Sequence, residues 1–179
     1  MDASIARTTR LHEHQVPDRG EKPMTVIAWD GQYVAADSLE TSGCVRSSRP
    51  VDKIEVREGV VYAVTGSAGL HKPLIDWLHE HNGDLDKRPV CHDEHQGTCV
   101  VKWEGGRCWS YDLKMPHPVE CFAPDAWGCG TAAHHVIGAM DSYVDAKTAV
   151  ERAIARNTCI GGPVQVVDLH AIPKPEDVV

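Results

Sequence analysis

The stretch that decides the fold runs from Met24 to Asp37 and reads MTVIAWDGQYVAAD. Its two apolar runs are typical of short β-strands, and Asp30-Gly31 between them is a common turn of a β-hairpin. Thr25 opens the first run. If the peptide bond before Thr25 is cut, the new α-amine has a pKa of roughly 8 and can accept the proton of the hydroxyl group on the same residue. The sequence therefore places a candidate nucleophile and its base at the start of a strand.

The rest of the chain alternates between strand and helix patterns. The apolar residues of the predicted helix at 70–81 form one stripe, with Pro73 in the first turn, where proline is tolerated. Asp145 is a candidate N-cap of the last predicted helix. The patterns predict strands at 53–57, 60–65, 98–103, 108–111 and 164–169, and helices near 70–81, 130–143 and 145–156. Paired hairpins with helices on their outer faces indicate an α+β sandwich in a single domain.

Composition and charge argue against several classes of function. The 179 residues are 42% hydrophobic and 25% charged, as in an ordinary globular domain. The net charge of −8 disfavours nucleic acid as a partner, because binding to phosphates needs clustered positive charge. No apolar run reaches the roughly 20 residues of a membrane-spanning helix, so we expect no membrane partner. The seven cysteines are an odd number, and residues 1–23 contain no signal-like segment, which predicts reduced thiols and a cytoplasmic location.

Six short segments follow one another along the chain, and their order and spacing are specific although each alone is weak. They are Thr25–Gly31, Ala35–Ser38, Lys53-Ile54, Gly66–Gly69, Gly128–Gly130 and Gly161–Val164. On these segments the chain resembles the proteasome β-type subunits, which are N-terminal nucleophile hydrolases, and in particular the compact proteasome-like proteins of bacteria and their phages. The resemblance spans about residues 25–170. It implies a four-layer αββα sandwich of two antiparallel sheets that assembles into rings or other homo-oligomers.

The resemblance also implies a division of the chain and a role for each matching residue. Residues 1–24 would be a propeptide or a flexible N-terminal extension, and residues 25–179 the hydrolase domain. Thr25 would be the nucleophile, Lys53 would lie beside its hydroxyl, and Asp37 would hold Lys53 charged and in position. The Gly66 N–H would stabilise the oxyanion. Cys129 stands where the family usually has a serine near the N-terminal amine, and a thiol is the weaker hydrogen-bonding group.

Two positions depart from the family pattern. Shortly before the Gly161-Gly162 pair, the family commonly has an aspartate and a serine close to the amine of the nucleophile. This chain has Asn157 and Ile160 there. Asparagine accepts hydrogen bonds without bringing charge, and isoleucine brings no polar group. A catalytically weak or inactive assembly protein of the same fold therefore stays open beside the enzyme.

The leading hypothesis from the sequence is a threonine-type endopeptidase that cleaves peptide bonds through an acyl-enzyme on Thr25, with no metal or organic cofactor. Its partners would be further copies of the chain and an unfolded polypeptide substrate. An ATPase partner is compatible with this class, although nothing in the sequence identifies one. A small-molecule amidase using the same nucleophile is a second alternative.

Two questions stay open at the level of sequence. Thr25 could be exposed by self-cleavage after Met24, or by translation from Met24 followed by removal of that methionine, or the bond could stay intact and block the amine. The segment Cys91–Cys99 holds two cysteines and two histidines, which suits zinc, but its spacing matches no usual zinc knuckle. A zinc-binding interaction module is therefore the most distant alternative.

Overall fold

The structure is a computed structural model that describes residues 25–42, 45–90, 98–115, 117–121 and 127–173. The predicted extension at residues 1–24 and all but the last two residues of the Cys91–Cys99 segment lie outside the described residues. Their predicted roles as a propeptide and as a zinc site therefore stay predictions.

Four antiparallel strands form the sheet that contains Thr25's strand. Its order is β10-β1-β2-β11, so the first hairpin lies at the centre. The strands are β1 (Val26–Trp29), β2 (Tyr33–Ala36), β10 (Trp127–Gly130) and β11 (Gln165–Asp168). A small two-stranded ribbon, β3 (Thr41–Ser42) with β4 (Val45–Arg46), follows β2 in the chain.

Five antiparallel strands form the second sheet, in the order β5-β6-β7-β8-β9. Because each strand pairs with its neighbour in sequence, this sheet is a simple meander. The strands are β5 (Ile54–Arg57), β6 (Val60–Thr65), β7 (Cys99–Glu104), β8 (Arg107–Asp112) and β9 (Val119–Cys121).

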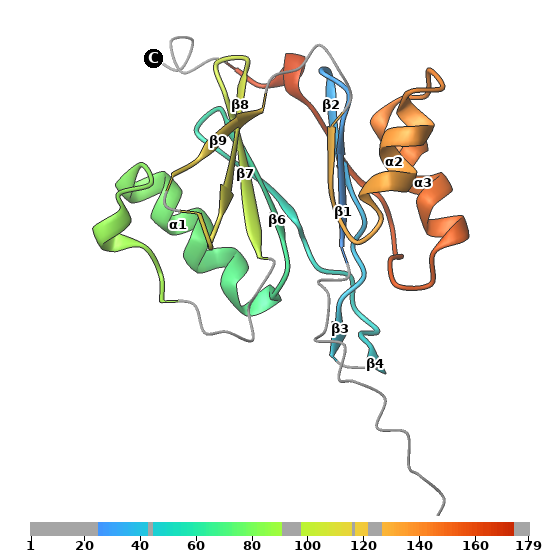
Figure 1. Cartoon of the computed structure of the whole chain (residues 1–179), viewed down its shortest axis with the longest axis horizontal. Coiled ribbons are helices and arrows are strands. Elements are labelled where there is room, and N and C mark those ends of the chain that lie inside the picture. Colours follow the sequence, from blue (N-terminus) through green and yellow to red (C-terminus); the bar gives the residue numbers. More distant parts are fainter. Residues whose placement is uncertain (1–24, 43–44, 91–97, 116, 122–126, 174–179) are drawn as a thin grey trace, which may run out of the picture.

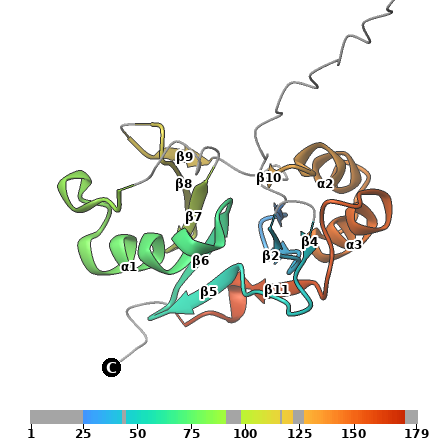
Figure 2. The same cartoon turned by 90° about the horizontal axis from the view of Figure 1, so that it is seen from below.

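Helices cover the outer faces of both sheets. The helical segments are η1 (Ala68–Leu70), α1 (His71–His81), η2 (Leu85–Lys87), α2 (Ala133–Met140), α3 (Ala146–Arg156) and η4 (Leu169–Ala171). Figures 1 and 2 show α1 on the outer side of the second sheet, and α2 and α3 on the outer side of the first. The predicted four-layer αββα sandwich is confirmed.

The alternation of side chains along β1 explains why four layers form. Val26 and Ala28 belong to the core between the first sheet and helices α2 and α3. Ile27 and Trp29 point the other way and pack between the two sheets. A third core joins β6 and β7 to α1. Both strands of the first hairpin, β1 and β2, are thus buried on both faces, which explains why their sequences are nearly continuous apolar runs.

The prediction of a helix near 130–143 was wrong at both ends. Residues 127–130 form strand β10, in which Gly130 pairs with Val26, and α2 begins only at Ala133. The two glycines of this strand carry no β-propensity, so the pattern did not reveal it. The strands β9, β3 and β4 were also missed. By contrast, the predicted N-cap is confirmed, because the Asp145 side chain accepts a hydrogen bond from the Thr148 N–H at 2.6 Å.

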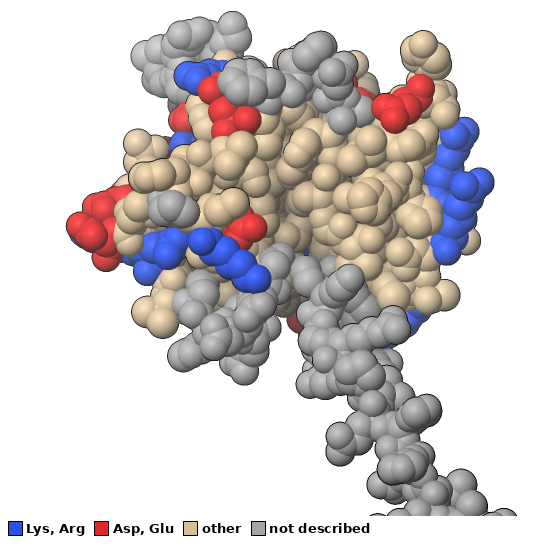
Figure 3. Space-filling model, in the orientation of Figure 1, with Lys and Arg blue, Asp and Glu red and all other residues tan. Residues whose placement is uncertain are grey.

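The surface carries charges of both signs. Figure 3 shows Lys and Arg gathered at the edge formed by α3, where Lys147, Arg152 and Arg156 are exposed, and a second row of them at the lower left beside acidic side chains. In the part of the chain that the structure describes, no helix has the length and apolar character needed to cross a membrane.

Candidate active site

The Asp37 carboxylate organises the residues that the sequence singled out. It lies just after β2, is fully buried, and accepts four hydrogen bonds. Oδ1 accepts from the Val26 N–H at 3.0 Å and from the Lys53 Nζ at 2.8 Å. Oδ2 accepts from the N–H groups of Leu39 at 3.3 Å and Gly161 at 3.1 Å. One carboxylate therefore joins the residue next to Thr25, the candidate lysine and the glycine pair.

Lys53 forms a buried ion pair with Asp37. Lys53 is only 3% exposed and lies just before β5. Burial lowers the pKa of the Lys53 ammonium, and the Asp37 charge opposes that effect. A lysine whose pKa is lowered gives up its proton more readily, so this ammonium can relay a proton to or from a neighbouring hydroxyl.

Thr25 is fixed in place through its backbone. The residue is 3% exposed, and its carbonyl accepts a hydrogen bond from the Thr131 N–H at 2.9 Å. Gly130 makes this contact close, because a Cβ on Gly130 would lie 1.9 Å from the Thr25 carbonyl oxygen. Alternation along the strand places the Thr25 side chain on the same face as Ile27, towards the space between the sheets.

Gly66 lies at the end of β6, in the opposing sheet, where the chain turns towards α1. Its φ is +97°, and a Cβ would come within 2.3 Å of the Thr98 Oγ1. The next residue, Ser67, donates its N–H to that same hydroxyl oxygen at 3.2 Å. Two residues before Gly66, the Val64 N–H donates to the Lys53 carbonyl at 3.0 Å, which ties this turn to the buried lysine.

The Gly161-Gly162 pair packs against the end of β2. The Ser38 N–H donates to the Gly161 carbonyl at 3.0 Å, and the Ser38 hydroxyl donates to the Pro163 carbonyl at 2.8 Å. Gly162 has a φ of +76°, and a Cβ there would lie 2.5 Å from the Ser38 Oγ. Gly162 is therefore required by its positive φ and this close approach, whereas a Cβ on Gly161 would meet Leu39 only at an ordinary contact distance of 3.6 Å.

Cys129 of β10 pairs with Ile27 of β1, and Ile27 is the second residue after Thr25. Its thiol packs in the core between the sheets, and burial raises its pKa well above the usual value. This thiol is therefore neutral and lies among apolar side chains. Its predicted role beside the amine of Thr25 stays a prediction.

The two departures from the family pattern have structural roles of their own. The Asn157 Oδ1 accepts a hydrogen bond from the Cys159 N–H at 2.8 Å, which shapes the turn after α3. Ile160 is 2% exposed and fills the core between the first sheet and its helices. Neither residue adds a charged group near Asp37.

One residue of this site was missed by sequence reasoning. His71, the first residue of α1, lies close enough to Lys53 for the two to interact electrostatically. Burial, and then the charge of Lys53, lowers the pKa of the imidazole to about 4. Its Nε2 is buried and has no hydrogen-bond partner among the described residues. No local signal in the sequence marks this histidine, because the group that it interacts with, Lys53, comes from the segment just before β5 rather than from α1.

Comparison with known proteins finds matches only among solved structures. No family model and no curated protein matches the chain. The BPH of Thiobacillus denitrificans in complex with epoxomicin has a TM-score of 0.60 and 19% identity, over 81% of this chain and 98% of that chain. HslV from Trypanosoma brucei has a TM-score of 0.61 and 13% identity, over 80% and 98%. A Gly-1 mutant of Anbu from Hyphomicrobium sp. strain MC1 has a TM-score of 0.59 and 13% identity, over 80% of each chain.

These three neighbours are all N-terminal nucleophile subunits of the proteasome type. At TM-scores of 0.59 to 0.61 and identities of 13% to 19%, the likeness concerns the fold. The resemblance inferred from the six sequence segments is confirmed at that level: this chain has the fold of the N-terminal nucleophile, proteasome-type subunits.

Proposed function

We propose that this chain is a threonine-type peptidase of the proteasome-like class. Thr25 attacks the peptide carbonyl after removal of residues 1–24, and its free α-amine takes the hydroxyl proton. Lys53 stabilises the developing alkoxide or relays the proton, and Asp37 positions Lys53. The Gly66 N–H stabilises the oxyanion, the α-ammonium gives its proton to the leaving amine as the C–N bond breaks, and water then hydrolyses the acyl ester on Thr25. We also propose that the chain associates with further copies of itself, as proteasome-type subunits do.

The observation that carries this proposal is the buried Asp37 carboxylate with its four donors. A buried ion pair costs several kcal/mol of desolvation per charge and contributes little net stability compared with apolar residues. The Lys53 Nζ and Asp37 Oδ1 atoms lie 2.8 Å apart. The same carboxylate oxygen accepts a hydrogen bond from the N–H of Val26, the residue after Thr25 at the start of β1. A perturbed lysine in that position is typical of a functional site.

The test is the intact mass of protein expressed from the full-length sequence, wild type beside Thr25→Ala. Loss of residues 1–24 from the wild type alone supports self-processing by a working nucleophile. Lys53→Met is the second variant, because it removes the proposed proton relay and keeps the buried stem. We expect it to retain residues 1–24. If wild type and both variants keep all 179 residues, the peptidase proposal is overturned.

Ligand binding gives an independent readout. BPH of Thiobacillus denitrificans was solved in complex with epoxomicin, so this compound is the first probe to use. We expect it to bind processed wild type and to bind a Thr25→Ala protein prepared without residues 1–24 at least tenfold more weakly. Equal binding to both proteins would mean that epoxomicin binding does not depend on the Thr25 hydroxyl.

A second candidate function is a non-catalytic assembly protein of the same fold. Ile160 favours it, because this position is filled by an apolar core side chain instead of a polar group. Restoring the family residues with Asn157→Asp and Ile160→Ser tests it directly. Peptidase activity in the double variant but not in the wild type would favour the assembly role.

A further inference from the structure

A cavity opens between the two sheets at the end of β1 that is opposite Thr25. Trp29 is four residues from Thr25, which is about 13 Å along an extended strand, so the cavity is separate from the candidate active site. Its volume is about 480 Å³, within the range of small-molecule sites. The wall contains Val61, Leu169 and Ile172 beside two tryptophans.

Glycines in the surrounding turns keep the mouth of this cavity open, because they carry no side chain. Three hairpin turns line it, and each contributes glycine: Gly31, Gly59, and Gly105 with Gly106. At Gly31, Gly105 and Gly106, nothing lies within 4 Å of the place where a Cβ would be. The Leu169 N–H donates to the Gln32 carbonyl at 2.8 Å, which fixes η4 as a wall against the first turn.

The two tryptophans carry buried donors that lack partners. Trp29 is 6% exposed and Trp103 4% exposed, and neither Nε1 has a hydrogen-bond partner among the described residues. An indole N–H can only donate, and leaving such a donor buried and unpaired costs about 1–3 kcal/mol as a general rule. The cavity thus offers donors to an acceptor that the described residues do not provide.

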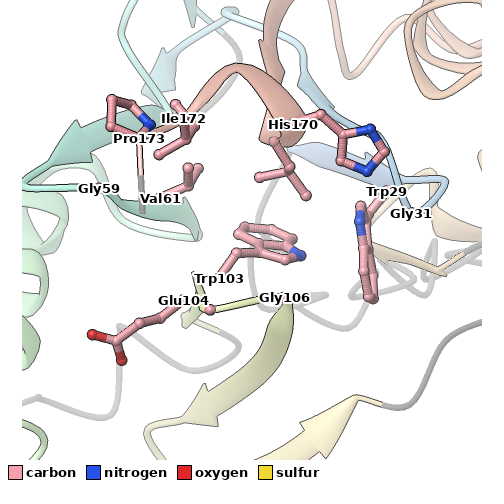
Figure 4. A pocket seen from close by; sticks show the side chains of 12 residues that line it. Trp29, Gly31, Gly59, Val61, Trp103, Glu104, Gly106, His170, Ile172 and Pro173 are labelled. Atoms are coloured by element: carbon pink, nitrogen blue, oxygen red, sulfur yellow. The ribbon is translucent and has the colours of Figure 1, made fainter. Parts of the chain in front are cut away.

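Figure 4 separates the two donors. The rings meet edge to face, with centroids 6.1 Å apart and planes at 70°. The Trp103 nitrogen lies at the end of its ring that faces the Trp29 ring. The Trp29 nitrogen lies at the end of its ring nearer His170. Trp29 Nε1 is therefore the donor that lies beside His170 in the cavity wall.

The acidic residue in the wall of the cavity is compensated, and a histidine adds a donor at the mouth. Glu104 points its carboxylate away from the tryptophans, and its Oε2 pairs with the Lys102 Nζ at 2.8 Å, so its charge is compensated. His170 is exposed at the mouth and adds a second donor beside Trp29. An oxygen of a carboxylate between these two groups would satisfy both.

We propose that this cavity binds a small hydrophobic carboxylic acid, aromatic or branched, whose carboxylate accepts from Trp29 Nε1 and His170 while its apolar body packs on Trp103 and Ile172. This site is distinct from the Thr25 site, and its existence does not depend on the proposed peptidase activity. Free metabolites and the C-terminal ends of apolar peptides share this chemistry.

The experiment is an NMR titration of the ¹⁵N-labelled full chain that follows the indole N–H signals. Trp29→Phe and Trp103→Phe assign the two signals. The probe is 3-phenylpropionate, and 3-phenylpropylamine is the matched control, because it has the same apolar body without an acceptor. We expect saturable binding of the acid with a downfield shift of the Trp29 signal, and no shift with the amine. A short peptide ending in Phe then distinguishes the two sources of the carboxylate by its relative affinity.

Two further variants keep the proposal falsifiable. Ile172→Trp fills the cavity and should abolish binding, whereas Val166→Trp, on the exposed part of β11, should leave it unchanged. Trp29→Phe removes the donor and should weaken binding roughly tenfold or more, the value of a hydrogen bond to a charged acceptor. The proposal is overturned if no probe shifts the Trp29 signal, if Ile172→Trp binds as wild type does, or if the signal moves with protein concentration alone, which would mean that a second copy covers the site.

Discussion

The two ends of the space between the sheets differ in how their polar groups are satisfied. At the Thr25 end, four donors from distant parts of the chain converge on one buried carboxylate. At the Trp29 end, two buried indole donors have no partner among the described residues. At the first end the buried carboxylate is fully hydrogen-bonded, and His71 Nε2 is the unpartnered group, whereas the donors at the second end line an open cavity and lack an acceptor. One fold can therefore hold, along the same strand, a buried and hydrogen-bonded ion pair and a cavity whose buried donors lack an acceptor.

Removing the carboxylate at the Thr25 end should have the largest effect. Asp37→Asn leaves the Lys53 ammonium buried without a counter-charge and weakens three backbone hydrogen bonds. We expect the free energy of unfolding to fall by about 3–5 kcal/mol, measured by urea denaturation. Glu120→Gln is the control, because it breaks only the surface pair with Arg107, 2.7 Å apart, and should leave the midpoint unchanged. Equal midpoints for both variants would contradict the assigned role of Asp37.

A matched pair of glycine substitutions compares the two ends directly. Gly130→Ala places a Cβ against the Thr25 carbonyl at 1.9 Å and should cost about 3–4 kcal/mol. Gly105→Ala, at the rim of the cavity, meets nothing within 4 Å and carries only the backbone cost of its φ of +56°, about 1 kcal/mol. Thermal unfolding of the two variants measures the difference. A cost at Gly105 as large as at Gly130 would mean that the cavity end is as closely packed as the other.

The buried His71 predicts an acid-sensitive stability at the Thr25 end. Its pKa is lowered from 6.5 to about 4 in the folded chain, so between these values the unfolded chain binds a proton that the folded chain does not. This contribution is complete above pH 6.5 and is lost as the pH falls towards 4, by up to about 3 kcal/mol. His71→Gln should flatten the profile of unfolding free energy in this window. An unchanged slope in that variant would assign the acid sensitivity to another group.

The smallest effect is expected from removing the unpaired donor at the other end. Trp29→Phe keeps an aromatic ring against Trp103 and removes a buried N–H that has no partner, so these two contributions largely offset. We expect a change of about 1 kcal/mol or less in unfolding free energy. Trp29→Ala is the control and should cost about 3–5 kcal/mol, because it deletes the whole ring from the core. A large loss in Trp29→Phe would mean that the N–H already has a partner in the folded chain.

Much of the fold could be predicted because its signals are local. The hairpin at residues 25–37, the meander strands β5 to β8 and the Asp145 cap each follow from periodicity or turn chemistry within a few residues. Strand β10 could not be predicted in this way, because its glycines are selected by the close approach of Thr25 rather than by a strand pattern. Of the site, Thr25, Asp37, Lys53, Gly66 and Cys129 were named through the resemblance, and the structure links Asp37 and Lys53 by a direct contact.

By itself, the sequence determined most of the strands and helices, the four-layer class of the fold and the residues worth testing, because short-range patterns and ordered motifs encode these. Only the tertiary structure decided how the buried groups are satisfied. The donors of Asp37 come from residues 26, 39, 53 and 161, His71 meets Lys53 across two elements, and Trp29 meets Trp103 across two sheets. Burial and hydrogen bonding depend on groups far apart in the chain, and folding alone brings them together.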